Sequence, residues 1–166
     1  MKNDFRLKYP LWMMAFIVLL AIIAYSLDSP VVEYVNNSNE TSMEMTIEPA
    51  KGIVLLVSLV LYFTLLAIFL LQLKKYNRQN PTQKISAISI RPPEYLEQDE
   101  GMTYITRKAV QKVYTYITWA LPILATIAII LPLSKLYIIY GILAVALGQY
   151  LIFYFEIRKH VKEETE

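Results

Sequence analysis

Four long runs of apolar residues, none containing Asp, Glu, Lys or Arg, dominate this chain of 166 residues. A helix needs roughly 20 apolar residues to cross the hydrocarbon core of a bilayer, and only a structure that satisfies its own backbone hydrogen bonds can do so. The runs lie at residues 9–27, 53–73, 113–133 and 136–155. The sequence therefore predicts an all-α fold, an integral membrane four-helix bundle that forms a single membrane domain over residues 1–166.

The composition supports a membrane protein and argues against several other classes. Hydrophobic residues make up 56% of the chain, against about 45–50% in soluble domains. The net charge of +2 is too small to suggest nucleic-acid binding. Cysteine is absent, which excludes disulfides and thiolate chemistry, and His160 is the only histidine. We therefore expect no metal site, no cofactor and no nucleic-acid partner.

The distribution of cations predicts the orientation, because Lys and Arg collect on the cytoplasmic side of a membrane. Of the 16 cations, 14 lie before the first run, between the second and third runs, or after the fourth. Only Lys51 and Lys135 lie on the other side, where five acids are found: Asp28, Glu33, Glu40, Glu44 and Glu48. We expect both termini to be cytoplasmic, in a multi-pass protein of the cell membrane, of the bacterial plasma-membrane type.

The first run has an alternative interpretation as a signal peptide. Ala24-Tyr25-Ser26 has the small-x-small spacing of a signal-peptidase site and follows a basic segment. The apolar run is longer than the usual 7–15 residues of a signal peptide. We therefore favour retention as a membrane anchor; cleavage would leave three spans.

Residues 28–52 form the predicted external loop. Val32 and Tyr34, and then Met43 and Met45, alternate with polar neighbours on either side of an Asn- and Ser-rich centre. This alternation is typical of a small β-hairpin, although an isolated two-stranded hairpin is marginal in water. The sequence favours a loose acidic loop and leaves a small external hairpin as the alternative.

Residues 74–112 form the predicted cytoplasmic segment. Met102, Ile105, Ala109 and Val113 recur at steps of three and four and form one apolar face, which leads directly into the third run after a break at Gly101. An acidic cluster precedes this face and consists of Glu94, Glu97, Asp99 and Glu100. Such carboxylates could hold Mg²⁺ or Ca²⁺, but a solvated first helical turn is the more usual role, and we do not predict a metal.

Juxtamembrane cations are the predicted contacts for anionic lipid headgroups, each contributing about 1 kcal/mol. The residues are Lys74, Lys75, Arg78, Arg107, Lys108 and Lys112. They also follow simply from topology, so their presence alone does not demonstrate a specific lipid site.

The fourth run carries a predicted helix-packing surface. Gly141, Ala144 and Gly148 recur at steps of three and four, and Gln149 follows them. Small residues let helices approach closely in lipid. A very short turn joins the third and fourth runs, so these must be antiparallel neighbours, and Ala125 and Thr126 are expected to lie opposite the glycines.

The spans offer little for catalysis or proton coupling. They contain hydroxyls but no base and no ionisable group, whereas proton-coupled transporters normally need one within the membrane. Glu156, beside Arg158 and Lys159 at the inner end of the fourth run, is expected to pair at the interface rather than relay protons.

These features favour a small non-enzymatic membrane protein that works by association with another membrane protein or peptide, as an accessory, assembly or immunity-type factor. A small transporter or channel that functions by self-association is the alternative. A lipid-modifying enzyme that uses the acidic cluster is the third hypothesis.

Overall fold

The computed structural model of the chain describes residues 5–28, 31–37, 40–46, 48–79, 81, 84 and 100–163. Most of these residues form four helices: α1 (Phe5–Leu27), α2 (Pro49–Gln79), α3 (Glu100–Ile130) and α4 (Lys135–Glu163). All four are long and apolar enough to cross a membrane. The prediction of four helices with the length and composition of membrane spans is therefore confirmed.

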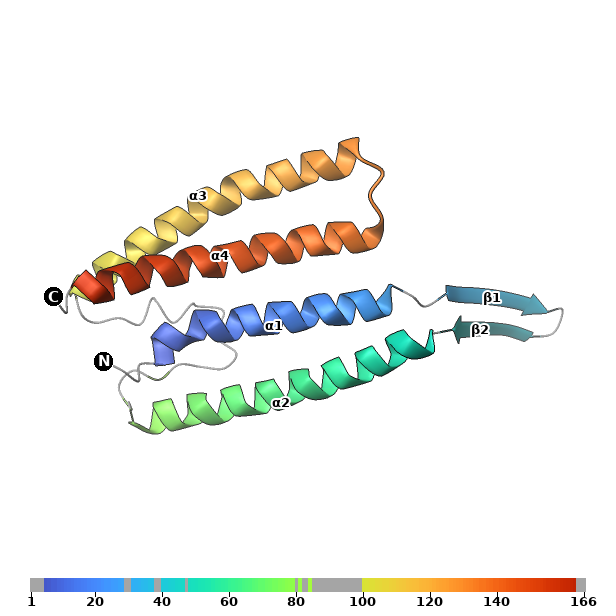
Figure 1. The fold of residues 1–166 in the computed structure, drawn as a ribbon, viewed down its shortest axis with the longest axis horizontal. Coiled ribbons are helices and arrows are strands. Elements are labelled where there is room, and N and C mark those ends of the chain that lie inside the picture. The colour runs from blue at the N-terminus through green and yellow to red at the C-terminus, as the bar shows by residue number, and fades with distance from the viewer. Residues whose placement is uncertain are drawn as a thin grey trace.

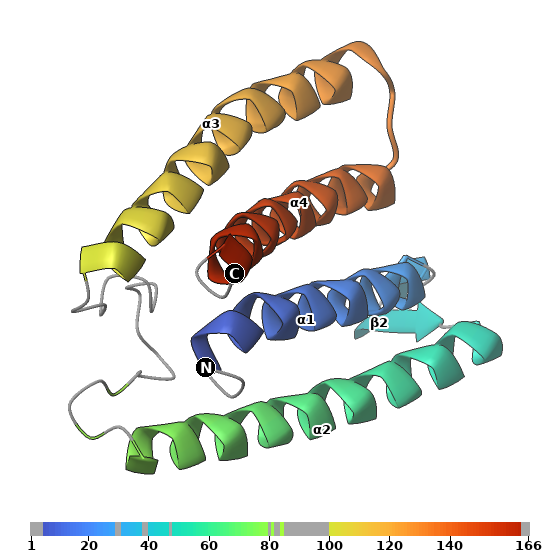
Figure 2. The same cartoon turned by 60° about the vertical axis from the view of Figure 1, so that its left-hand side comes forward.

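The four helices lie side by side in the order α2, α1, α4, α3, and neighbours run antiparallel (Figure 1). Figure 2 shows the same order from another side. Extensive contacts join α2 to α1, α1 to α4, and α4 to α3. Over the described residues the helices thus form an open layer with α2 and α3 at its edges. The start of α1 and the end of α4 lie at one end of this layer, which we call the terminus end (Figure 1).

Aromatic side chains hold α1 against α2. Phe16 of α1 and Phe69 of α2 are buried, and their rings meet edge to face with centroids 5.8 Å apart. The Trp12 ring meets Phe69 in the same way, also at 5.8 Å. Leu73 completes the buried cluster. Because such ring pairs add about 0.5–1.5 kcal/mol beyond the area they bury, this cluster fixes how the two helices pack.

Part of the predicted apolar face of residues 102–113 packs against α4. Ile105 and Ala109 are buried, and Val113 packs beside Ala109 against Phe153 and Ile157 of α4. The segment belongs to the same continuous helix as the third apolar run, since α3 extends from Glu100 to Ile130. Gly101, where the sequence predicts a break, therefore lies in the first turn of this helix.

The helices end at different residues from the charge-free runs. Helix α2 continues through Lys74 and Lys75 to Gln79. Helix α3 ends at Ile130, three residues short of the end of the run predicted at about 113–133. Pro132 explains the difference, since proline disfavours helical geometry in the residue before it.

Two strands follow α1, namely β1 (Val31–Asn37) and β2 (Glu40–Thr46). They pair antiparallel, with Val31 opposite Thr46 and Asn37 opposite Glu40. Both lie beyond the helices, at the end of the layer away from the start of α1 (Figure 1). We call this end of the layer the strand end.

Candidate functional site

Three of the predicted lipid-contacting cations gather at the terminus end of α2. Lys74, Lys75 and Arg78 line a depression of about 480 Å³ together with Leu71 and Gln79. All three cations are exposed, and no acid is among the described residues that line the depression. We call this feature the basic depression. Three positive charges beside one leucine are suited to the phosphate of a lipid headgroup.

The other three predicted cations lie on α3, apart from the basic depression. Arg107 and Lys108 are exposed. Lys112 donates a hydrogen bond to Glu156 of α4, with 2.6 Å between Nζ and Oε2. The Glu156 side chain is only 11% exposed, whereas that of Lys112 is 52% exposed. This ion pair ties α3 to α4 near the terminus end.

The two glycines of α4 lie against α3. A Cβ at Gly141 would overlap the end of the Leu124 side chain, and a Cβ at Gly148 would overlap the ring and hydroxyl of Tyr116. Helices that approach closely at small residues gain packing energy in lipid. The absence of a side chain at each glycine is therefore what lets the α3 side chains reach the α4 backbone.

The other residues of the predicted packing surface are placed differently. Ala144 is exposed and lines a groove between α1 and α4, and Gln149 is half-buried. Ala125 and Thr126 are both exposed, so the prediction that they lie opposite the glycines is wrong. Helical spacing places residues on a common face, but it does not say which neighbour that face meets.

Small residues instead line an exposed face of α3. Thr115, Thr118, Pro122 and Ala125 follow one another at steps of three and four residues, which places them on one face, and all four are exposed. The threonine hydroxyls donate to carbonyl oxygens four residues earlier, at 3.0 and 2.8 Å. Thr126 does the same at 2.8 Å. The spacing is visible in the sequence, but the exposure of this face depends on the helix order.

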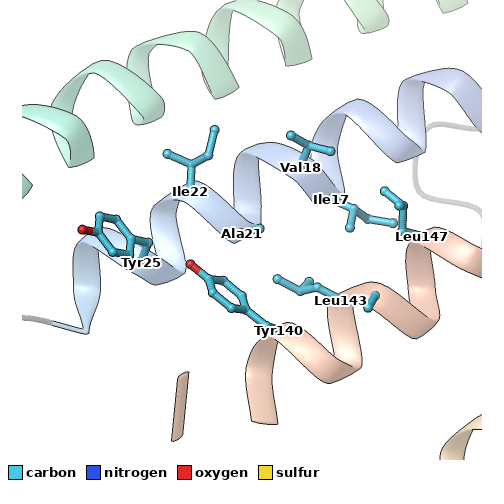
Figure 3. A pocket seen from close by; sticks show the side chains of 9 residues that line it. Ile17, Val18, Ala21, Ile22, Tyr25, Tyr140, Leu143 and Leu147 are labelled. Carbon is cyan, nitrogen blue, oxygen red and sulfur yellow. The ribbon is translucent and has the colours of Figure 1, made fainter. Parts of the chain in front are cut away.

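An apolar groove of about 480 Å³ lies between α1 and α4 (Figure 3). The small side chains of Ala21 and Ala144 help to line it. Aliphatic side chains line the rest: Ile17, Val18, Ile22, Leu143 and Leu147. Tyr25 and Tyr140 lie together at one end of the groove (Figure 3). The ammonium of Lys51 lies 5.3 Å from the centre of the Tyr25 ring.

Hydroxyl groups within the spans are hydrogen-bonded to their own helices. Ser26 donates to a carbonyl oxygen at 3.1 Å and Ser58 at 2.9 Å. Over the described residues, no three His, Cys, Asp or Glu side chains gather in a group that could hold a metal. Of the acidic cluster, Glu94, Glu97 and Asp99 lie outside the described residues and Glu100 begins α3. The arrangement thus offers surfaces for packing and for headgroup contact.

Comparison with known proteins finds no family model that matches the chain. No curated protein and no solved structure matches it either.

Proposed function

We propose that the protein is a small, non-enzymatic integral membrane protein that acts by associating with another membrane protein or peptide, as an accessory, assembly or immunity-type factor. The main support is the exposed small-residue face of α3, formed by Thr115, Thr118, Pro122 and Ala125. Small residues let helix backbones approach closely, and close packing drives helix association in lipid. A helix in contact with acyl chains alone would gain nothing from them.

The position of α3 in the layer also supports association. It is an edge helix, and none of the residues in its most apolar 18-residue stretch is buried. The hydroxyls of Thr115 and Thr118 already have acceptors within α3. A partner helix could therefore cover this face without leaving a buried donor unsatisfied, which would cost free energy.

Photo-crosslinking in native membranes tests this proposal. A benzophenone side chain at Ala125 should form a discrete adduct with a second polypeptide, whereas the same group at Val57, exposed on α2, should form only lipid adducts. Thr118→Leu should abolish the protein adduct, because the larger side chain keeps a partner backbone away. The matched change Val57→Leu should leave it intact. Lipid adducts alone at Ala125 would contradict the proposal.

The same experiment distinguishes the alternative function. The described helices form a single layer that encloses no path of its own, so a transporter or channel would have to self-associate. An adduct of twice the chain mass at Ala125, together with substrate flux in proteoliposomes, would favour that alternative over association with another protein.

We further propose that both termini and residues 74–112 face the cytoplasm and that residues 28–52 are external. The 14 cations other than Lys51 and Lys135 support this orientation. The start of α1 and the end of α4 lie at the same end of the layer as the basic depression at Lys74, Lys75 and Arg78 (Figure 1). We propose that this depression contacts anionic headgroups of the inner leaflet, and that Arg107, Lys108 and Lys112 lie at the same surface.

Cysteine labelling in intact cells tests the orientation. The chain has no cysteine of its own, so a single introduced thiol reports without background. Asn37→Cys should react with a membrane-impermeant maleimide, and Gln79→Cys should react only after the membrane is permeabilised. The reverse pattern would contradict the orientation.

A further inference from the structure

The α1–α4 groove occupies one half of the membrane-spanning length. On α1 it extends from Ile17 to Tyr25, and on α4 from Tyr140 to Leu147. Eight residues of helix advance about 12 Å at 1.5 Å each. One leaflet contributes about half of a hydrocarbon core that is about 30 Å thick. The groove therefore matches the depth of a single leaflet, the one at the strand end.

The size of the groove favours a hydrocarbon chain over a helix as its occupant. Its volume is about 480 Å³. A helix with side chains is about 10–12 Å across, so a 12 Å length would need roughly 1,000 Å³. The lining is aliphatic along the length of the groove, and the small side chains of Ala21 and Ala144 leave the space open. One acyl chain suits both the volume and the lining.

The strand end of the groove carries groups that suit a polar head. The hydroxyl of Tyr140 points toward α1 and Tyr25 (Figure 3). Lys51 lies over the Tyr25 ring, and its ammonium is 3.8 Å from a carboxylate oxygen of Glu48. That distance exceeds the 2.7–2.9 Å or so of a charge-assisted hydrogen bond. Both charges can therefore accept a further partner.

The balance of charge at this end favours a headgroup with no net charge. Lys51 is accompanied by Glu48, and the exposed Lys135 and Asp28 begin α4 and follow α1. These four charges cancel. A phosphate joined to an amine would thus find both signs.

We propose that the groove holds one acyl chain of a zwitterionic phospholipid from the leaflet at the strand end. The phosphate lies at Lys51 beside the Tyr25 and Tyr140 rings, and the amine faces Glu48. This inference does not depend on which side of the membrane the strand end faces, nor on the partner proposed for α3.

Native mass spectrometry of the full chain tests the proposal. The protein in mild detergent is mixed with equal amounts of synthetic phosphatidylethanolamine and phosphatidylglycerol that carry the same chains. One phosphatidylethanolamine should be retained in preference. Lys51→Gln should weaken its retention about fivefold, as expected for the loss of one lipid-contacting cation. Ala144→Phe should abolish it by filling the groove.

Two controls separate the groove from other lipid contacts. Ala67→Phe, an equal change at an exposed position of α2, should leave retention unchanged. The triple variant Lys74→Gln, Lys75→Gln, Arg78→Gln should reduce phosphatidylglycerol binding alone. Equal retention of both lipids by this triple variant, or undiminished phosphatidylethanolamine retention by Ala144→Phe, would overturn the proposal.

Crosslinking keeps the test decisive if the Ala144 variant fails to fold. A phosphatidylethanolamine with a diazirine on its acyl chain should label residues 17–25 and 140–147 of the unaltered protein. Labels confined to other segments, or a protein adduct formed from a photoreactive group at Ala21, would show that the groove serves another occupant.

Discussion

Replacing Gly148 with leucine is expected to destabilise the packing of α4 on α3 strongly. Even a Cβ at this position would lie 2.8 Å from Cζ and 3.2 Å from Cε1 of the Tyr116 ring, and closer still to its hydroxyl. Leucine adds three further carbons, which can be accommodated only by moving α3 away from α4. Overpacking of a close contact costs about 1–3 kcal/mol and sometimes more, and we expect about 3 kcal/mol or more here. Thermal unfolding in mild detergent, followed by circular dichroism, measures the effect.

Three further variants show whether the α3 contact is the cause. Ile142→Leu changes a side chain that is 51% exposed and should leave stability unchanged. Gly141→Ala should cost less than Gly148→Ala, because the obstructing atom is the free end of the flexible Leu124 side chain rather than part of a ring. Tyr116→Ala should partly rescue Gly148→Leu. If Gly148→Leu unfolds at the same temperature as Ile142→Leu, the glycines do not determine the packing of α3 on α4.

The number and class of the helices follow from the sequence because a bilayer imposes a single strong requirement. A run of about 20 apolar residues without a charge can cross a bilayer only as a helix. Each of the four runs forms such a helix. The apolar face containing Ile105 and Ala109 follows from helical spacing in the same way.

The helix ends are less predictable. An apolar run indicates which residues contact lipid, whereas a helix ends where its backbone hydrogen bonds end. Helix α2 continues past its last apolar residues to Gln79, and α3 begins at Glu100, well before its charge-free run. Polar residues with adequate helix propensity extend a helix that is already formed, since elongation adds one hydrogen bond for each residue fixed. Pro132 is the exception, because its effect on α3 is local and visible in the sequence.

The sequence does not predict the order of the helices in the layer. The candidate surfaces depend on that order. Because α4 lies between α1 and α3, its small residues divide: Gly141 and Gly148 meet α3, and Ala144 faces the groove beside α1. Spacing alone predicts one continuous stripe. The exposed face of α3 at Thr118 and Ala125 has the same origin, since an edge helix contacts one neighbour and leaves its opposite face uncovered.

We expect the loss of Lys112 and the loss of Glu156 from their ion pair to change stability by unequal amounts. Lys112→Met removes the ammonium that lies 2.6 Å from a carboxylate that is only 11% exposed. Weakening the contacts of a buried charged group costs about 1–3 kcal/mol, and we expect a loss in that range. Glu156→Gln leaves an ammonium that is 52% exposed and can contact water, and the amide oxygen can still accept its hydrogen bond. This change should cost less than about 1 kcal/mol, as for exposed pairs.

The double variant of the two substitutions identifies the source of this asymmetry. Once Glu156 is an amide, no poorly exposed carboxylate remains to be stabilised. Adding Lys112→Met should then cost much less stability than it does in the unaltered protein. The coupling between the two changes measures the interaction itself, because the residues are in direct contact. Lys108→Met, on an exposed side chain of the same helix, is the matched control and should have little effect. Additive losses in the double variant, or equal losses from the two single variants, would mean that the burial of Glu156 does not govern the pair.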